Sequence, residues 1–205
     1  MLTAPLNSLL TRPYAFFGHS MGALVSYELA CRLRSKGVAG PVHIVVSGHR
    51  APQLPDRNIQ VHKLSDQEIL AKLRRLGGTP EEVLQDPELM EMYLPVLRAD
   101  FAVCETYKYE HRQPLGCSIT ALGGTEDAEV SREELSAWYI HTRGSFSLHM
   151  FPGSHFFMQD DQSLFFQLLA QDFRRVLRRM PQSTQTSPHE PPSGPRANRA
   201  RAYLF

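Results

Sequence analysis

The stretch from Tyr14 to Ala30, which reads YAFFGHSMGALVSYELA, constrains the fold of this chain more than any other part of the sequence. A short apolar run is followed at once by the letters GHSMG and then by a helix-forming segment. This order of strand, G-x-S-x-G and helix is the pattern of a nucleophile elbow, in which a serine occupies a sharp turn between a strand and a helix. The alternative is an ordinary glycine-rich turn in which Ser20 caps the helix.

The spacing of this motif has a physical cause. A serine at such a turn adopts a strained backbone conformation, and its neighbours two residues away on either side must be small. Gly18 and Gly22 meet that requirement and let the strand and the helix pass close together. The amides that begin the helix, near Met21, favour a developing negative charge. We therefore expect the Ser20 hydroxyl to project clear of the sheet and to act as a nucleophile.

The rest of the pattern predicts an α/β fold with a mostly parallel sheet and flanking helices. The apolar run before the elbow suits a strand that is covered on both faces, as strands of parallel sheets are. The helix after the elbow ends near Gly37 and leads to a second strand, which makes a β-α-β unit. We expect strands at 14–17, 42–47, 117–122 and 146–151, and helices at 21–35, 132–142 and 161–179.

Residues 61–111 carry repeated helix-start signals, which predict a helical insertion between two strands. Ser65 and Glu68 form a capping box, which opens a helix that closes at Gly77. Two further starts follow, with Pro80 expected at the first helical position and a longer helix continuing to about Tyr109. This is more than one crossover helix needs, and in a hydrolase it would be a lid. As a group, its apolar residues are expected to shape a greasy pocket; they include Leu89, Met92, Tyr93, Leu97, Phe101 and Val103. The alternative is that these residues only pack the insertion onto the core.

The bulk properties describe one ordinary globular domain. The chain has 205 residues, of which 42% are hydrophobic and 21% charged, and its net charge of +1 gives no reason to propose nucleic acid or a membrane surface as a partner. Its three cysteines, Cys31, Cys104 and Cys117, are too few and too widely spaced for a disulfide framework or a zinc site. We expect a cytoplasmic protein with an ordered domain over 1–180. The proline-, serine- and arginine-rich segment 181–205 is expected to be a disordered tail.

Two residues follow predicted strands at positions that suit the base and the orienting acid of a serine nucleophile. Asp127 follows one predicted strand in a glycine-rich loop, and His155 follows the next. The order Ser20, Asp127, His155 is the chain order of α/β-hydrolase triads. A histidine must accept the serine proton, and a carboxylate must orient that histidine. Because the carboxyl ends of parallel strands share one edge of a sheet, we expect these three side chains to meet.

Other residues compete for these roles or could line the same pocket. The loop after the second strand carries His49 and Arg50, which either line a pocket at the sheet edge or lie in a solvated loop. His19 lies inside the elbow and is expected to pack beside the nucleophile rather than act as the base. The remaining competitors lie on helices, within a strand or beside the proposed acid: Asp100, Glu126, Glu129, His141 and His149.

At this point the sequence resembles a known family. The segments GHSMGALVSYELA, SGHRAPQLP, LRRLGGTPEEVL, LPVLRADFAVCETY, GGTEDAEVS and MFPGSHFF together look like type II thioesterases. These are the editing thioesterases of nonribosomal peptide and polyketide synthesis, which are related to the medium-chain thioesterase of fatty-acid synthesis. The resemblance covers about residues 10–178, and it includes the lid and the strand ends as well as the elbow.

The resemblance implies an α/β-hydrolase fold with a helical lid that hydrolyses thioesters on the phosphopantetheine arm of carrier proteins. It implies Ser20 as the nucleophile, His155 as the base and Asp127 as the orienting acid. It also implies an acyl or peptidyl carrier protein as the partner and no metal or organic cofactor in the enzyme. If the chain is complete, we expect a monomer. A general esterase or acyltransferase of the same fold remains an alternative, because the fold does not set the substrate.

One departure from the family leads to a further expectation. Members carry an upstream portion with several strands and a glycine-containing loop, which supplies the second oxyanion amide beside that of Met21. This sequence begins just before the elbow strand, so we expect a partial fold with an unpaired apolar edge. Loss of one oxyanion donor costs about 10²–10³ in rate in a known hydrolase. We therefore expect the chain alone to be poorly active or unstable, or to serve as an inactive module that binds carrier proteins.

Overall fold

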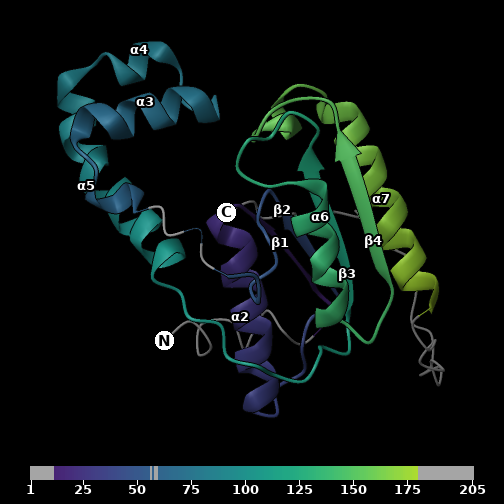
Figure 1. The fold of residues 1–205 in the computed structure, drawn as a ribbon. Coiled ribbons are helices and arrows are strands. Elements are labelled where there is room, and N and C mark those ends of the chain that lie inside the picture. Colours follow the sequence, from purple (N-terminus) through teal and green to yellow (C-terminus); the bar gives the residue numbers. More distant parts are fainter. Residues whose placement is uncertain (1–11, 56, 58–59, 180–205) are drawn as a thin grey trace, which may run out of the picture.

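The structure of the protein is a computed structural model that describes residues 12–55, 57 and 60–179 (Figure 1). The proposed tail, 181–205, lies outside these residues. The elements are β1 (Ala15–His19), α2 (Met21–Ser35), β2 (His43–Ser47), η1 (Val61–Lys63), α3 (Asp66–Leu76), α4 (Glu81–Leu84), α5 (Pro87–Glu105), β3 (Ser118–Gly124), α6 (Arg132–Ser136), η2 (Ala137–His141), β4 (Phe146–Phe151), η3 (Phe157–Gln159) and α7 (Gln162–Arg179).

The described strands form one sheet of four strands in the order β1-β2-β3-β4, and every pair is parallel. The register brings Gly18 opposite Val46, and Val46 opposite Ala121. The predicted α/β class is therefore confirmed, and each predicted strand agrees with its observed counterpart to within two residues. Since all strands run the same way, the loops that follow β1, β2, β3 and β4 emerge at a single edge of the sheet.

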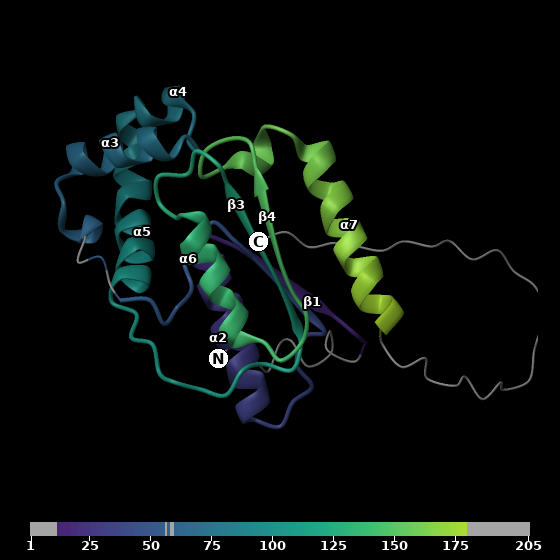
Figure 2. The same cartoon turned by 45° about the vertical axis from the view of Figure 1, so that its right-hand side comes forward.

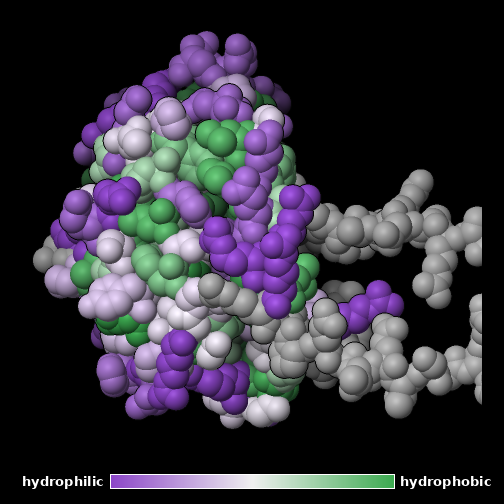
Figure 3. All heavy atoms as spheres, turned by 90° about the vertical axis from the view of Figure 1, so that its right-hand side faces the viewer, coloured by the Kyte–Doolittle hydropathy of each residue, from purple (hydrophilic) through white to green (hydrophobic). Residues whose placement is uncertain are grey.

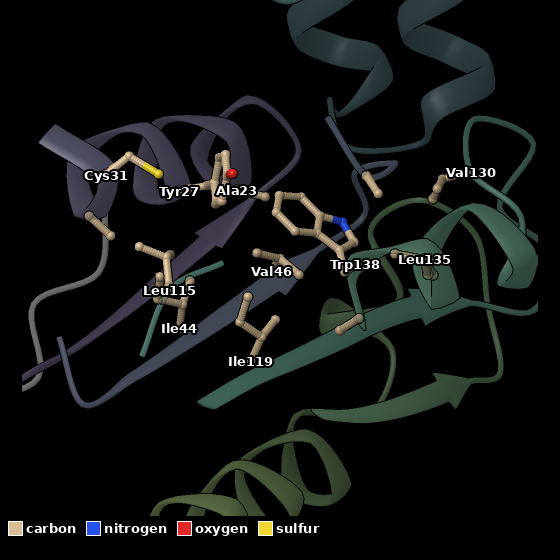
Figure 4. Packing of buried hydrophobic residues seen from close by; sticks show 13 residues of the cluster. Ala23, Tyr27, Cys31, Ile44, Val46, Leu115, Ile119, Val130, Leu135 and Trp138 are labelled. Carbon is tan, nitrogen blue, oxygen red and sulfur yellow. The ribbon is translucent and has the colours of Figure 1, made fainter. Parts of the chain in front are cut away.

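Helices cover both faces of the sheet (Figures 1 and 2). One face carries α2 and α6, and between them and the strands lies the larger core, which includes Tyr27, Ile44, Ile119, Leu135 and Trp138. Figure 4 shows the Trp138 indole lying among Val46, Leu135 and Ala23. Every residue of β2 is buried. The prediction of a strand covered on both faces concerns the run before the elbow, and there it is wrong: β1 is only partly buried except at Gly18, because it lies at the edge of the described sheet.

The other face is covered by α7. Phe165 and Leu169 of this helix pack against Phe17 and Val45 of the sheet. The same interface holds a buried carboxylate, Asp172, that accepts a hydrogen bond of 2.8 Å from the Thr120 hydroxyl and pairs with Arg175 at 2.9 Å. Figure 3 views this side of the molecule, where hydrophobic and hydrophilic residues are interspersed on the surface. The exposed large hydrophobic side chains of α7 are Leu164, Phe166 and Leu177.

The segment 61–105, which we call the lid, is a separate group of helices beside the sheet (Figures 1 and 2). It has its own small core, whose buried members are Val61, Ile69, Leu73, Leu84, Met90 and Leu94. The capping box predicted at Ser65 is present, and Gly77 ends α3 in a left-handed conformation with a φ of 75°. The lid therefore folds around local signals that are readable in the sequence.

Three predicted details of the helices are wrong. The long helix α5 ends at Glu105 rather than near Tyr109. Pro80 is the N-cap of α4 and not its first residue. The capping box at Ser131 does open α6, but the helix gives way after Ser136 to a 3₁₀ turn that ends at His141. That tighter turn places Trp138 and His141 in the core, so burial of these side chains takes precedence over continuation of the α-helix.

Within the part of the chain that the structure describes, no helix is both long enough and apolar enough to cross a membrane.

Candidate active site

Ser20 occupies the turn between β1 and α2 in a strained conformation. Its φ of 52° is positive, and among the described residues it is the only non-glycine residue for which this is so. The turn is held by a hydrogen bond of 2.7 Å from the Ser20 amide to the Ser47 carbonyl at the end of β2. A nucleophile elbow has this combination of a strained serine and a fixed strand end.

The two glycines of the motif differ in what they allow. A Cβ added at Gly18 would lie 2.0 Å from the carbonyl oxygen of Gly22, so only glycine permits the strand and the helix to pass there. A Cβ added at Gly22 would meet nothing within 4 Å among the described residues. The expectation that both neighbours must be small is therefore correct for Gly18 and wrong for Gly22. The backbone of Gly22 fills the space where a side chain at position 18 would lie, whereas the space beside Gly22 is open among the described residues.

His155 and Asp127 form a hydrogen-bonded pair across two loops at the same sheet edge. The distance from His155 Nδ1 to Asp127 Oδ2 is 2.9 Å, and the two side chains are 6% and 0% exposed. The other carboxylate oxygen of Asp127 accepts a hydrogen bond of 2.8 Å from the Glu129 amide. An ionised carboxylate can only accept, so His155 Nδ1 carries the proton and its Nε2 is left as the basic atom.

Ser20 and His155 both line a cavity of about 490 Å³ between the sheet edge and the lid. His49 and Arg50 line it as well, so the pocket interpretation of this loop is correct and the solvated-loop alternative is wrong. Asp127 is not part of the wall, because it lies behind His155. Within the described residues the Ser20 hydroxyl forms no side-chain hydrogen bond. Catalytic hydrogen bonds are often long in unliganded enzymes and shorten when substrate binds.

Several wall residues come from the lid and from the segment that follows it, and sequence reasoning did not single them out. They are Val61, Lys72, Leu76, Glu105, Tyr107 and Tyr109. Phe101 and Cys104 also contribute, and burial raises the pKa of the Cys104 thiol to about 11, which keeps it protonated. The cavity therefore combines apolar, aromatic and charged groups. Of the apolar lid residues predicted to shape a pocket, only Phe101 lines the cavity, and Met92, Tyr93 and Val103 are exposed. The prediction that the lid forms a pocket wall is thus supported, but mainly by residues that the sequence did not suggest.

His19 packs beside the proposed base, as expected from the sequence. Its ring lies 4.8 Å from the His155 ring, centroid to centroid, and its Nδ1 is 3.0 Å from the Ser47 hydroxyl. Burial, and after it repulsion from His155, lowers the pKa of His19 to about 4, although the Asp127 charge acts in the opposite direction. His19 is therefore neutral and weakly basic near pH 7. It supports the His155 ring without competing for the serine proton.

The competitors His141, His149 and Glu129 have partners of their own, although Glu129 also lines the cavity. His141 is in the core, where its Nδ1 is 3.1 Å from the Tyr27 hydroxyl. His149 Nε2 is 3.3 Å from Asp172 on the α7 side of the sheet. Glu129 pairs with Lys72 of the lid, and Asp100 lies on α5. Of the histidines considered, His155 is the one that both lines the cavity with Ser20 and is hydrogen-bonded to a carboxylate.

Two arginines in the loop after β2 pair with a glutamate of α6. Glu134 lies 3.6 Å from Arg50 and also pairs with Arg57. His49 Nδ1 is 2.7 Å from the Arg50 carbonyl, and burial lowers the pKa of His49. Among the described residues, no group of three or more His, Cys, Asp or Glu side chains is arranged to hold a metal ion.

The parallel sheet with covering helices and an elbow serine defines the class of protein as an α/β-hydrolase fold. The family model described as "Thioesterase domain" matches residues 1–174, and the chain belongs to this family.

Individual relatives agree with the family. The chain is 49% identical over 164 residues to the protein of Brevibacillus parabrevis named linear gramicidin dehydrogenase LgrE, which covers 78% of this chain and 61% of that protein. It is 45% identical over 172 residues to the gramicidin S biosynthesis protein GrsT of Aneurinibacillus migulanus, covering 84% and 67%. The structure of the type II thioesterase BorB from the borrelidin biosynthetic cluster superposes with a TM-score of 0.73 at 40% identity, covering 82% and 68%. The chain thus spans about three fifths of the length of the first of these relatives.

Proposed function

We propose that this chain is a serine hydrolase that cleaves acyl or peptidyl thioesters from the phosphopantetheine arm of carrier proteins, in editing or chain release. The hydrogen bond of 2.9 Å between His155 and Asp127, at a cavity that Ser20 shares with His155, is the observation that carries the proposal. Membership in the thioesterase family and similarity to proteins of peptide-antibiotic synthesis support the substrate class.

The proposed reaction transfers the acyl group in two steps. Ser20 Oγ attacks the thioester carbonyl while His155 Nε2 takes its proton, and the C–S bond breaks as that proton passes to the departing thiolate. A water molecule then attacks the acyl-serine ester and gives its proton to His155, which returns it to Ser20 as the free acid leaves. Asp127 keeps the imidazole in the required tautomer and stabilises the imidazolium that forms in each step.

The N-terminus of α2 is the proposed site for the negative oxygen of each tetrahedral intermediate. Met21 is the first residue of that helix, and the amides of a first turn have no partner inside the helix. Its N–H can therefore donate to the oxygen, and the helix dipole favours the negative charge. We propose no metal or organic cofactor for this chemistry, because each step uses only proton transfer and acyl transfer among the named groups.

The proposed setting is the cytoplasm, with an acyl or peptidyl carrier protein as the partner and a monomeric enzyme. The three cysteines are free thiols, which suits a reducing compartment. Ser20, Asp127, His155 and the Met21 amide all belong to this one chain. The dehydrogenase activity in the name of one relative is not proposed here. Ser20 occupies the position where a G-x-G-x-x-G dinucleotide fingerprint requires its second glycine.

The experiment is to load a carrier protein with a short acyl group and to follow its deacylation by intact-protein mass spectrometry. We expect slow cleavage by the chain, because the proposed oxyanion site has a single amide, that of Met21, and for Ser20→Ala only the uncatalysed background. The matched control is an oxygen ester of the same acyl group. Equal rates on the oxygen ester would favour a general esterase. A folded chain that binds the carrier without cleaving it would favour an inactive binding module and contradict the proposal.

A further inference from the structure

The C-terminal end of α3 contacts both loops that carry the proposed acid and base. Lys72, on this helix, pairs with Glu129 in the loop after β3. Gly78, just past the end of the helix, lies against the ring of Phe156 in the loop after β4. These two loops hold Asp127 and His155. One short piece of the lid therefore meets both members of the hydrogen-bonded pair through their immediate neighbours.

The contact at Gly78 is close enough to exclude any other residue. A Cβ added there would lie 2.1 Å from Phe156 Cε2 and 2.5 Å from two further atoms of the ring. The Phe156 ring is only partly buried, but its centroid is 5.2 Å from those of both the His19 and the His155 rings, so a shift of this ring changes the packing around the proposed base. A side chain at position 78 would therefore displace either the lid or Phe156, whose ring packs against that of the proposed base. The backbone of Gly78 does not have a positive φ, so the requirement for glycine is steric.

The contact at Lys72 reaches the proposed acid through the backbone. The Lys72 side chain is only 13% exposed, and its ammonium group pairs with the Glu129 carboxylate, which is 33% exposed. The amide of the same Glu129 donates the 2.8 Å hydrogen bond to Asp127 Oδ1. The lid thus fixes the side chain of a residue whose backbone orients Asp127. A partly desolvated pair of this kind is costly to break on one side only.

We propose that Lys72 and Gly78 are positioning residues, through which the seated lid holds the Asp127–His155 pair in its reactive geometry. Neither residue contacts the reacting atoms in this account. The proposal rests on the proposed function and deepens it: hydrolysis is fast only while the lid is seated on both loops. A lid displaced to admit the substrate arm leaves His155 less ordered until α3 returns to Phe156 and Glu129.

The steric arm is tested with Gly78→Ala and with the double variant Gly78→Ala/Phe156→Leu, which removes the ring that the new methyl would meet. We expect Gly78→Ala to lower kcat by on the order of 10²-fold with a smaller change in KM, since small displacements of catalytic groups cost that much. The double variant should recover most of the loss. Gly40→Ala is the matched control, because a Cβ at Gly40 meets nothing within 4 Å among the described residues.

The electrostatic arm is tested with Lys72→Glu, Glu129→Lys and the double swap. Each single variant should lower kcat, and the swap should restore it in part because an opposite-charge pair is re-formed. Arg74→Glu is the control, since Arg74 lies on the same helix but pairs with Glu81 inside the lid. Loss of activity in both singles and in the swap alike would contradict the proposal, because the two side chains would then act separately.

A readout that needs no turnover separates this proposal from the proposed function. The proton on His155 Nδ1 gives an NMR signal that reports its hydrogen bond to Asp127. We expect that signal in the parent chain, its loss or exchange broadening in Gly78→Ala, and its return in Gly78→Ala/Phe156→Leu. An unchanged signal and unchanged kcat in Gly78→Ala would overturn the inference. Absence of hydrolysis by the parent chain would instead count against the proposed function, and the NMR comparison would still decide the inference.

Discussion

The sheet region and the lid are stabilised by different kinds of packing. The sheet is packed on both faces, with Trp138 at 0% exposure in one layer and Phe157 at 1% in the other. The lid has one small core of its own, and polar contacts join the beginning of the segment to its end. Glu105 accepts hydrogen bonds from the amides of Val61 and His62, which joins the two ends of the segment.

This difference separates two tasks of the site. The sheet sets where Ser20, Asp127 and His155 lie, because each follows a strand and the strands are parallel. The lid completes the cavity and contacts the sheet region at a few places, such as Lys72 with Glu129 and Gly78 with Phe156. A self-contained lid can move as a unit without losing its own core. If the two regions are independent, a substitution in the core of the lid should leave the sheet region folded.

The largest effect is expected from Trp138→Ala in the sheet region. The indole is fully buried, packs against Tyr27 at 5.5 Å between ring centroids, and donates a hydrogen bond of 2.8 Å to the His49 carbonyl. Removing such a residue costs about 3–5 kcal/mol. We expect the whole chain to unfold at lower denaturant concentration, measured by circular dichroism. Tyr139→Ala is the control, because the adjacent Tyr139 is 61% exposed and should change little.

A lid substitution should instead act locally. Ile69 is 0% exposed in the lid core, and Ile69→Ala should cost about 2–5 kcal/mol within that unit. We expect faster amide hydrogen exchange in α3, α4 and α5, while β2 and β3 keep their protection, since local opening needs less free energy than global unfolding. Val96→Ala on the exposed face of α5 is the control. Equal acceleration in the lid and in the sheet would show that the two regions unfold together.

A smaller effect is expected from acid, and it should arise in the sheet region. Burial, with a minor contribution from the charge of His111, lowers the pKa of His141 to about 4. The ordinary value is about 6.5, so between pH 6.5 and pH 4 the unfolded chain binds the proton more readily than the folded one. Stability should therefore fall as pH decreases through this window.

His141→Gln should remove the contribution of His141 to the loss of stability at low pH. By linkage, a group with these two pKa values contributes a loss of about 2 kcal/mol between pH 7 and pH 5. We expect the free energy of unfolding of the variant to decline less than that of the parent by about this amount, measured by urea titration at both pH values. His19, whose pKa is also about 4, should account for part of the slope that remains. Identical declines in the two proteins would contradict the assignment.

The sequence predicts the sheet region and its site better than it predicts the lid contacts. The strand before Ser20, the capping boxes at Ser65 and Ser131, and the positions of Asp127 and His155 at strand ends all follow from local patterns. Parallel strands then bring the strand ends together without further information. Local order of this kind is what single-sequence patterns encode.

The errors and omissions have a common physical origin in tertiary packing. The double glycine at Gly77 and Gly78 is readable as a helix stop, but its contact with Phe156 depends on how the lid sits on the sheet. Lys72 and Glu129 are 57 residues apart, and nothing local marks them as partners. The 3₁₀ turn after Ser136 is likewise set by burial of Trp138 and His141. Contacts between distant segments decide these features, and propensity does not.

The central claim is that Ser20 is a nucleophile activated by His155 at this sheet edge. The most direct measurement is labelling of the folded chain with a fluorophosphonate probe, followed by peptide mass spectrometry. The account predicts one adduct on the peptide that contains Ser20, and loss of that adduct in His155→Ala while the fold is retained. Labelling that persists at Ser20 without His155, or a folded chain whose Ser20 is never labelled, would contradict it.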